Sequence, residues 1–257
     1  MSGPEGIPAG PEPVRAVLLD ALGTLVSLEP PGPRLRAELA RRGFEVSEGA
    51  SAAAFRAEID YYLEHHLEGR DARSLADLRD RCAEVVRATL AVPRLDHETT
   101  RAAMLAALSF RAQPDAPGAL AALRAQGLRL VAASNWDCSL PRVLEHAGLA
   151  PLLDGVVTSA EVGAAKPDPR VLEAALAVAG ARAEEAVHVG DSADTDLPAA
   201  VAAGVRAVLL DRTDDARAWG SPPGPGETGP RSGAPASAPP AIIRTLAELP
   251  SLVLEPR

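Results

Sequence analysis

Aromatic residues are scarce in this sequence, where Phe, Trp and Tyr together make up 3% of 257 residues. A hydrophobic core must therefore be built from Ala, Leu and Val, and a hydrophobic content of 47% is enough to form one. No apolar run approaches the ~20 residues that a membrane-spanning helix needs. The N-terminal stretch also lacks the basic region and apolar block of a secretion signal, so we expect residues 1–13 to form a flexible leader.

Cysteine and positive charge are also in short supply. Cys82 and Cys138 are too few for a disulfide framework or a cysteine metal cluster, which favours a reducing, cytoplasmic location. The 35 acidic residues outnumber the 26 basic ones and give a net charge of −9. This balance argues against nucleic acid or an anionic membrane as the main partner. We therefore expect a small-molecule partner, and no pattern in the sequence indicates an oligomeric state.

Short apolar runs alternate with helical stretches. Five runs are predicted to be buried strands: 16–20, 129–134, 154–159, 186–191 and 206–211. Helices are predicted after the N-caps Asp115 and Asp168, the second with Pro169 at its first position. Such alternation is typical of βαβ units and predicts an α/β fold with a parallel sheet. His188, inside the fourth run, is expected to be a core histidine with satisfied hydrogen bonds.

The segment 30–112 has a different pattern, without a convincing strand. Amphipathic stretches at 47–67, 72–91 and 96–110, the last with Asp96 as a cap, predict a helical block. We therefore expect a helical cap at 30–112, inserted into a core made of 14–29 and 113–257. Residues 220–240 are rich in Pro, Gly and Ser and are predicted to be a disordered loop. The apolar content returns after residue 240, so the last stretch is expected to pack on the core.

Polar residues with chemical potential stand at the ends of the predicted strands. Asp20 ends the first strand, Ser134 and Asn135 the second, and Asp191 the fourth, while Lys166 lies in a loop after the third. The carboxyl ends of parallel strands meet at one edge of a sheet, so these groups should converge there. Carboxylate oxygens are ligands for Mg²⁺, whereas an ammonium and a hydroxyl bind phosphate oxygens. The set therefore suits a phosphorylated substrate with Mg²⁺ as cofactor.

Four motifs in the chain resemble those of a known superfamily. "DALGTL", "AASNWD", the Lys of "GAAKPDP" and "VGDSADTD" are similar, in this order, to the four motifs of the haloacid dehalogenase (HAD) superfamily of hydrolases. The similarity covers roughly residues 14–211, and the helical block falls at the position of that superfamily's first cap domain. The resemblance implies a Rossmann-like core and hydrolysis through a covalent aspartyl-enzyme.

The resemblance also implies a role for each matching residue. Asp20 corresponds to the catalytic nucleophile, and Lys166 to the second catalytic residue, which steadies both the nucleophile and the phosphate. Ser134 corresponds to the phosphate-binding hydroxyl, with Asn135 beside it in the substrate site. The implied ligands of Mg²⁺ are the side chains of Asp20, Asp191 and Asp196 and the backbone carbonyl of Leu22.

Leu22 departs from the superfamily's phosphatase pattern. The phosphatases have Asp at this position, which protonates the leaving oxygen and later activates water, and Leu can do neither. General acid–base catalysis typically contributes roughly 10²–10⁴ in rate, so its loss is large. Covalent catalysis and electrostatic stabilisation would still operate.

Three functions are compatible with these residues. A Mg²⁺-dependent phosphatase of a small metabolite is the leading expectation. A metal-independent dehalogenase acting on carbon would also lack a carboxylate at position 22, because a halide leaves without a proton. Asp191 and Asp196 argue against it, since those dehalogenases lack this arrangement of acids. The third possibility is a non-catalytic protein that binds phosphate at the same site.

Overall fold

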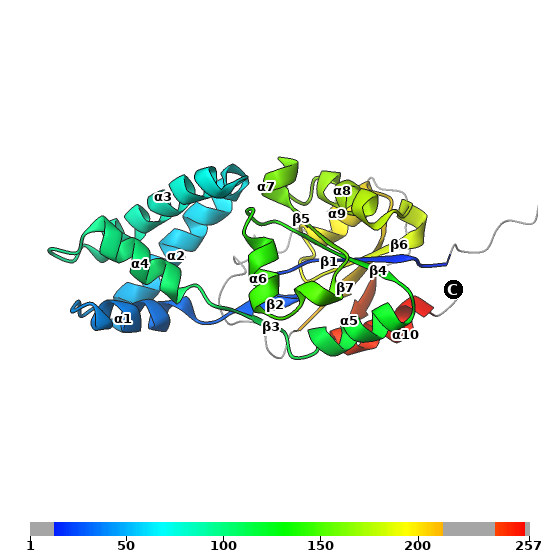
Figure 1. Cartoon of the computed structure of the whole chain (residues 1–257), viewed down its shortest axis with the longest axis horizontal. Coiled ribbons are helices and arrows are strands. Elements are labelled where there is room, and N and C mark those ends of the chain that lie inside the picture. The colour runs from blue at the N-terminus through cyan, green and yellow to red at the C-terminus, as the bar shows by residue number, and fades with distance from the viewer. Residues whose placement is uncertain (1–12, 213–239, 255–257) are drawn as a thin grey trace, which may run out of the picture.

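A six-stranded parallel sheet forms the centre of the computed structural model, which describes residues 13–212 and 240–254 (Figure 1). Its strand order is β5-β4-β1-β6-β7-β8. The strands are β1 (Ala16–Leu19), β4 (Arg129–Ser134), β5 (Gly155–Thr158), β6 (Ala186–Gly190), β7 (Arg206–Leu210) and β8 (Ala241–Ile243). All five predicted strands are present, and every pair of neighbours in this sheet is parallel. The predicted α/β class is thus confirmed.

Helices cover both faces of the sheet. Val17 and Leu19 of β1 pack in one hydrophobic cluster, whereas Ala16 and Leu18 pack in the other, because successive strand residues point to opposite faces. The first cluster includes residues of α5 (Ala116–Ala125), α6 (Leu140–His146) and α10 (Leu249–Leu254). The second includes residues of α8 (Arg170–Ala179) and α9 (Asp196–Ala202), and α7 (Ser159–Val162) packs against it. Burial on both faces explains why the strands appear as continuous apolar runs.

The starts of two helices test the predicted caps. Asp115 occupies the N-cap position of α5 as predicted, but its side chain makes no capping hydrogen bond. The prediction of Asp168 as the N-cap of α8 is wrong by one residue, because Pro169 occupies that position and the helix begins at Arg170. The Asp168 carboxylate still accepts a hydrogen bond from the Arg170 N–H at 3.0 Å. It therefore satisfies a free N–H at the helix start from one position further out.

Residues 31–107 form a helical unit beside the sheet (Figure 1). Its helices are α1 (Pro31–Arg41), α2 (Glu48–His65), α3 (Ala72–Leu90) and α4 (His97–Ala107), and η1 (His66–Glu68) continues α2. Asp96 caps α4 as predicted, since its carboxylate accepts from the Thr99 N–H at 2.7 Å. The unit has its own hydrophobic core, to which Leu39, Phe55 and Met104 contribute. The three predicted helical stretches are therefore confirmed, and α1 is an additional helix.

A short antiparallel ribbon joins the helical unit to the sheet. It consists of β2 (Val26–Leu28) paired with β3 (Phe110–Ala112). The expectation that no strand lies within 30–112 is therefore wrong for its last three residues. β3 is only three residues long and partly exposed, so it lacks the apolar run by which the buried strands were predicted. The assignment of 30–112 as a separate domain remains a prediction.

The described C-terminal segment returns to the sheet as expected. Ile243 in β8, Leu246 in η4 (Leu246–Glu248), and Leu249 and Val253 in α10 are buried in the same cluster as Val17. The other short helical turns are η2 (Ala150–Leu152) and η3 (Ala183–Glu185). The predicted leader and the predicted loop at 220–240 lie outside the described residues, apart from their final positions. Among the helices of 13–212 and 240–254, none has the length and apolarity needed to cross a membrane.

Candidate active site

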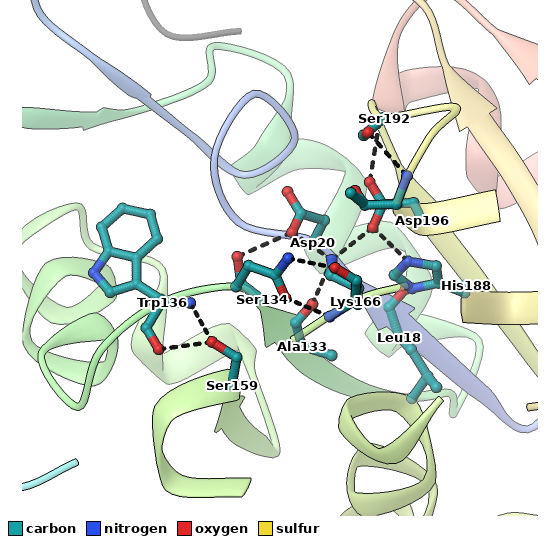
Figure 2. A network of polar contacts seen from close by, with 12 residues as sticks. Leu18, Asp20, Ala133, Ser134, Trp136, Ser159, Lys166, His188, Ser192 and Asp196 are labelled. Atoms are coloured by element: carbon teal, nitrogen blue, oxygen red, sulfur yellow. Dashed lines mark hydrogen bonds and ion pairs between the residues drawn. The ribbon is translucent and has the colours of Figure 1, made fainter. Parts of the chain in front are cut away.

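The predicted polar residues converge at the carboxyl edge of the sheet, where Figure 2 shows Asp20, Ser134 and Lys166. Asp20 follows β1, Ser134 ends β4, and Asp191 follows β6. β1 lies between β4 and β6 in the sheet, so the three strand ends are neighbours. The sequence placed these residues at one site because parallel strands end at a common edge.

Lys166 links two of the acids. Its ammonium group donates hydrogen bonds to Asp20 Oδ1 and Asp196 Oδ1, both at 2.6 Å, and to the carbonyl of Ala133 at 3.0 Å. These contacts use all three donors of the ammonium group. Burial opposes the charge, but the carboxylates of Asp20 and Asp196 outweigh it and hold the pKa of Lys166 above its ordinary value. The side chain is therefore a fixed, buried positive charge.

Asp20 is held by two donors on the same oxygen. Oδ1 accepts from Lys166 and from the Ser134 hydroxyl, the latter at 2.9 Å. Burial raises the pKa of Asp20 above its ordinary value, and Lys166 acts in the opposite direction. Because both side-chain contacts converge on Oδ1, the second oxygen, Oδ2, is available to a substrate or a cation. Asp20 is thus oriented as a nucleophile would need to be.

Asn135 contacts the main chain of Lys166. Its amide nitrogen donates to the Lys166 carbonyl at 2.9 Å, and its amide oxygen accepts from the Lys166 N–H at 2.7 Å. This pair of hydrogen bonds ties the loop after β4 to the loop that carries Lys166. In this arrangement Asn135 holds Lys166 in place, while its expected contact with substrate remains a prediction.

Three carboxylates form a compact acidic cluster. Asp20, Asp191 and Asp196 each offer an oxygen within 4.8 Å of the others, and Asp191 is the member most exposed to solvent. Loss of hydration, together with the neighbouring carboxylates of Asp20 and Asp196, raises the pKa of Asp191 to about 7. Lys166 supplies one positive charge against three acids. The donor set is therefore hard, oxygen-rich and negatively charged, which fits a divalent cation such as Mg²⁺.

The turn after Asp20 approaches this cluster closely. Gly23 has a φ of +82°, and a Cβ built on it would lie 2.0 Å from Asp191 Oδ2. Only glycine fits here, both for its backbone conformation and for the missing side chain. Leu22, one residue earlier, has 37% of its surface exposed, so its side chain is only partly packed.

Asp196 is tied into the interior by His188. Its Oδ1 accepts from Lys166 and contacts His188 Nε2 at 2.9 Å, while Oδ2 accepts from the Ser192 N–H at 3.1 Å. Burial alone would raise the pKa of Asp196, but Lys166 and His188 outweigh it and lower the pKa well below its usual range. Nδ1 of His188 contacts the Leu18 carbonyl at 3.1 Å, so both ring nitrogens have partners. The expectation of a satisfied core histidine is confirmed.

The contact between His188 and Asp196 was not anticipated from the sequence. A usable signal is Gly190, which lies two residues after His188 and thus on the same face of β6. A Cβ on Gly190 would lie 2.2 Å from Cγ of Asp196, so the glycine makes room for that carboxylate. A histidine followed at i+2 by glycine in a buried strand is thus consistent with an acid packed on that face.

A hydrogen bond connects the helical unit to the loop after β4. The Tyr62 hydroxyl, from α2, donates to Asp137 Oδ2 at 2.9 Å, and the Ser139 N–H donates to Oδ1 at 2.7 Å. Asp137 lies three residues after Ser134, so the loop that follows the Ser134 hydroxyl touches the helical unit. This link was also missed, because the sequence gives no indication that residues 62 and 137 meet.

Trp136 occupies the inner side of the same loop. Its backbone N–H donates to the Ser159 hydroxyl at 3.0 Å, and that hydroxyl donates to the backbone carbonyl of Trp136 at 3.2 Å (Figure 2). Its ring lies 5.0 Å from the ring of Phe110 in β3. The residue therefore packs between the site loop and the ribbon that leads to the helical unit.

Comparison with known protein families agrees with this architecture. The family of haloacid dehalogenase-like hydrolases matches residues 14–204, and a second group of HAD-like hydrolases matches residues 163–249. The first match spans most of the chain. The protein therefore belongs to the haloacid dehalogenase-like hydrolase family, as the four motifs predicted.

Individual relatives carry phosphatase and dehalogenase names. A phosphoserine phosphatase of Thermus thermophilus is 45% identical over 100 residues, which cover 38% of this chain and 40% of the relative. A haloacid dehalogenase-like hydrolase domain-containing protein 3 of Bos taurus is 38% identical over 95 residues, covering 37% and 38% respectively. The aligned regions thus span about two fifths of these relatives.

Solved structures share the fold over almost the full chain. A HAD phosphatase from Thermococcus onnurineus has a TM-score of 0.58 and 26% identity, and the match covers 95% of this chain and all of that one. An L-2-haloacid dehalogenase from Xanthobacter autotrophicus has a TM-score of 0.64 and 23% identity, with 93% and 98% covered. At that identity the second likeness shows the fold alone.

Proposed function

We propose that the protein is a phosphatase that hydrolyses a small phosphorylated metabolite through an aspartyl-phosphate on Asp20. The observation that carries this proposal is the buried Lys166 ammonium group, which bridges the carboxylates of Asp20 and Asp196 beside a third acid, Asp191. The phosphatase names of several relatives support the same chemistry. These relatives are matched over less than half of their length, so their activity is proposed for this chain and does not follow from the similarity alone.

The first step is a transfer of the phosphoryl group to the protein. Oδ2 of Asp20 attacks phosphorus while Lys166 and Ser134 hold Oδ1. The bond between phosphorus and the leaving oxygen breaks, and that oxygen takes a proton from water. The fixed charge of Lys166 stabilises the negative charge on the phosphoryl oxygens without any reorganisation during the reaction.

The second step returns the nucleophile to its starting state. A water molecule attacks phosphorus, the bond to Asp20 breaks, and inorganic phosphate leaves with the water's oxygen. Leu22 can neither protonate the leaving oxygen nor take the proton from this water. Both protons are therefore exchanged with solvent, and we expect a phosphatase of reduced rate on poor leaving groups.

We further propose that the acidic cluster holds Mg²⁺. Asp20 and Asp191 would supply carboxylate oxygens and Leu22 its main-chain carbonyl, with Asp196 beside them. When bound, the cation neutralises negative charge on the phosphoryl group as a Lewis acid. The excess of carboxylates over Lys166, and the pKa of Asp191 near 7, favour a site that is completed by a cation.

The helical unit is proposed to act as a cap over the reacting centre. Its support is the contact between Tyr62 and Asp137, which brings α2 to the loop that follows Ser134. A cap at this place would exclude bulk water from the phosphoryl group and would select the substrate. The proposed site of action is the cytoplasm, on the evidence of the cysteine content alone.

A substrate screen with and without Mg²⁺ tests the proposed function. The panel contains alkyl phosphates, aryl phosphates, acyl phosphates and 2-haloacids, and the variant Asp20→Asn is the control for each activity. We expect phosphate release only with Mg²⁺, and a phosphorylated Asp20 in rapidly quenched samples. Metal-independent halide release would instead show carbon chemistry, and binding of phosphate without turnover would show a binding protein.

Calorimetry separates the cation site from the chemistry. We expect Asp191→Asn to weaken Mg²⁺ binding by about tenfold or more, because it removes a charged ligand. Asp194→Asn is the matched control, since Asp194 is an exposed acid of the same motif outside the cluster. Equal affinities in wild type, Asp191→Asn and Asp194→Asn would contradict the proposed ligand set.

A further inference from the structure

Arg212 contacts the turn that follows Asp20. It lies two residues after the end of β7, at the carboxyl edge of the sheet. Its Nε donates to the carbonyl of Gly23 at 3.1 Å, and its Nη2 donates to the carbonyl of Thr24 at 3.2 Å. Only 12% of the arginine side chain is exposed. The guanidinium group of Arg212, which is planar and largely shielded from solvent, therefore binds two consecutive carbonyls of the turn.

A second side chain supports the same turn. The amide nitrogen of Gln113 donates to the Gly23 carbonyl at 3.3 Å, and the Gln113 N–H donates to the Leu25 carbonyl at 2.9 Å. Inside the turn, the Gly23 N–H donates to the Val26 carbonyl at 2.8 Å. The turn is thus bound both internally and from the ribbon side.

Asp115 fixes the guanidinium group of Arg212. Its two oxygens accept from Nη1 and Nη2, both at 2.9 Å, in a bidentate pair. One of these oxygens also accepts from the Thr245 hydroxyl at 2.6 Å and from the Leu246 N–H at 2.8 Å. Burial opposes the charge of Asp115, but these donors outweigh it and lower the pKa of the carboxyl. This explains why Asp115 does not cap α5, since its side chain is engaged with Arg212.

We propose that Arg212 is a positioning residue that fixes the turn 20–24, and with it the Leu22 carbonyl, against the cation site. The proposal rests on the proposed function, in which that carbonyl is a ligand of Mg²⁺. Position 22 has no carboxylate to offer, so its main-chain oxygen is its entire contribution to a cation. That oxygen lies between Asp20, whose N–H donates to the Val189 carbonyl of β6 at 2.9 Å, and Gly23, whose carbonyl accepts from Arg212.

The effect of Arg212 is geometric rather than electrostatic. Its charge is paired with Asp115 at close range, so the pair adds little net field at the acidic cluster. Its planar fork, by contrast, reaches the Gly23 and Thr24 carbonyls and Asp115 together, which a lysine ammonium cannot reproduce. Arg212→Lys should therefore weaken Mg²⁺ binding and the protection of the turn nearly as much as Arg212→Gln does.

The test compares Arg212→Gln and Arg212→Lys with Arg34→Gln. Arg34 is a chemical match, because its Nε donates to the Ala107 carbonyl at 3.1 Å and its Nη1 pairs with Glu29 at 2.9 Å, away from the turn. Mg²⁺ affinity is measured by calorimetry, and amide hydrogen exchange is measured at Gly23 and Val26 without metal. For Arg212→Gln we expect a loss of about tenfold or more in affinity and faster exchange at both amides. Arg34→Gln should leave both quantities unchanged.

The outcomes distinguish the failure of this proposal from failure of the proposed function. Wild type that binds Mg²⁺ and releases phosphate, with Arg212 variants unchanged in affinity and exchange, would overturn the positioning role alone. Wild type that binds no Mg²⁺ would overturn the proposed cation site. In that case, faster amide exchange at Gly23 in Arg212→Gln than in wild type would still support the role of Arg212 in holding the turn, and equal exchange would overturn it. Should Arg212→Gln fail to fold, Arg212→Lys carries the same two measurements.

Discussion

Replacing Leu22 by Asp tests the proposed chemistry directly. The variant Leu22→Asp restores a carboxyl group at the position where the phosphatases of this superfamily carry one. It should speed the hydrolysis of alkyl phosphates, whose leaving oxygen needs a proton. Aryl phosphates leave with less help, so their rates should rise less. The sign and the substrate dependence of the change are therefore both predicted.

The size of the gain follows from the exposure of this position. General acid–base catalysis is worth roughly 10²–10⁴ in rate when the acid is well matched in pKa. Leu22 has 37% of its surface exposed, so an Asp there would keep much of its hydration. An aspartate with an ordinary pKa of about 4 is protonated in only about one molecule in a thousand at neutral pH. We therefore expect a gain at or below the lower end of this range, about tenfold to a hundredfold on alkyl phosphates.

The assay is the initial rate of phosphate release with saturating Mg²⁺ across mildly acidic to mildly basic pH. Leu22→Asn is the matched control, because the Asn side chain has the same shape as Asp but its amide is neither an acid nor a base near neutral pH. The double variant Asp20→Asn, Leu22→Asp must lose the gain, since it lacks the nucleophile. The reasoning is refuted if Leu22→Asp folds, binds Mg²⁺ and hydrolyses alkyl phosphates no faster than Leu22→Asn. Carbon chemistry or simple phosphate binding would then account better for Leu22.

Three further predictions follow from the site and the helical unit. Wild-type turnover should fall steeply as the pKa of the leaving group rises, and equal rates on alkyl and nitrophenyl phosphates would mean that another group supplies the proton. Burial raises the pKa of Glu58 to about 7, so the contribution of this carboxyl to the free energy of unfolding is present at low pH and is lost as the pH rises through that value. In urea unfolding, Glu58→Gln should remove this pH dependence, which amounts to at most about 3 kcal/mol. Gly23→Ala should weaken Mg²⁺ binding and lower the melting temperature, because its Cβ would meet Asp191 and its φ is +82°; unchanged calorimetry and melting would show that the turn can move aside.

The sheet and the convergence of its acids could be predicted from the sequence for a simple reason. Strands buried on both faces appear as continuous apolar runs, and a polar residue directly after each run marks the carboxyl edge. Asp20, Ser134 and Asp191 follow this rule, so their meeting needed only the parallel topology. The strand β3 did not follow it, because it is short and pairs in a partly exposed ribbon.

The contacts that the sequence did not reveal join residues from distant segments. Arg212 contacts Asp115, 97 residues away in the chain, and Tyr62 contacts Asp137, 75 residues away. A lone arginine or tyrosine carries no local pattern that names its partner. The local role of Asp115 as a cap was predicted from its position, but the tertiary contact with Arg212 claims its carboxylate instead.

The place of Trp136 gives the protein a built-in optical probe. Its indole is almost fully buried, lies against Phe110 of the ribbon, and precedes Asp137, the partner of Tyr62. The ring therefore lies close to both connections between the helical unit and the sheet. The sequence contains two tryptophans, and Trp219 lies outside the described residues. In a Trp219→Phe background, the emission of a single indole would show whether the helical unit moves relative to the sheet, without an attached dye.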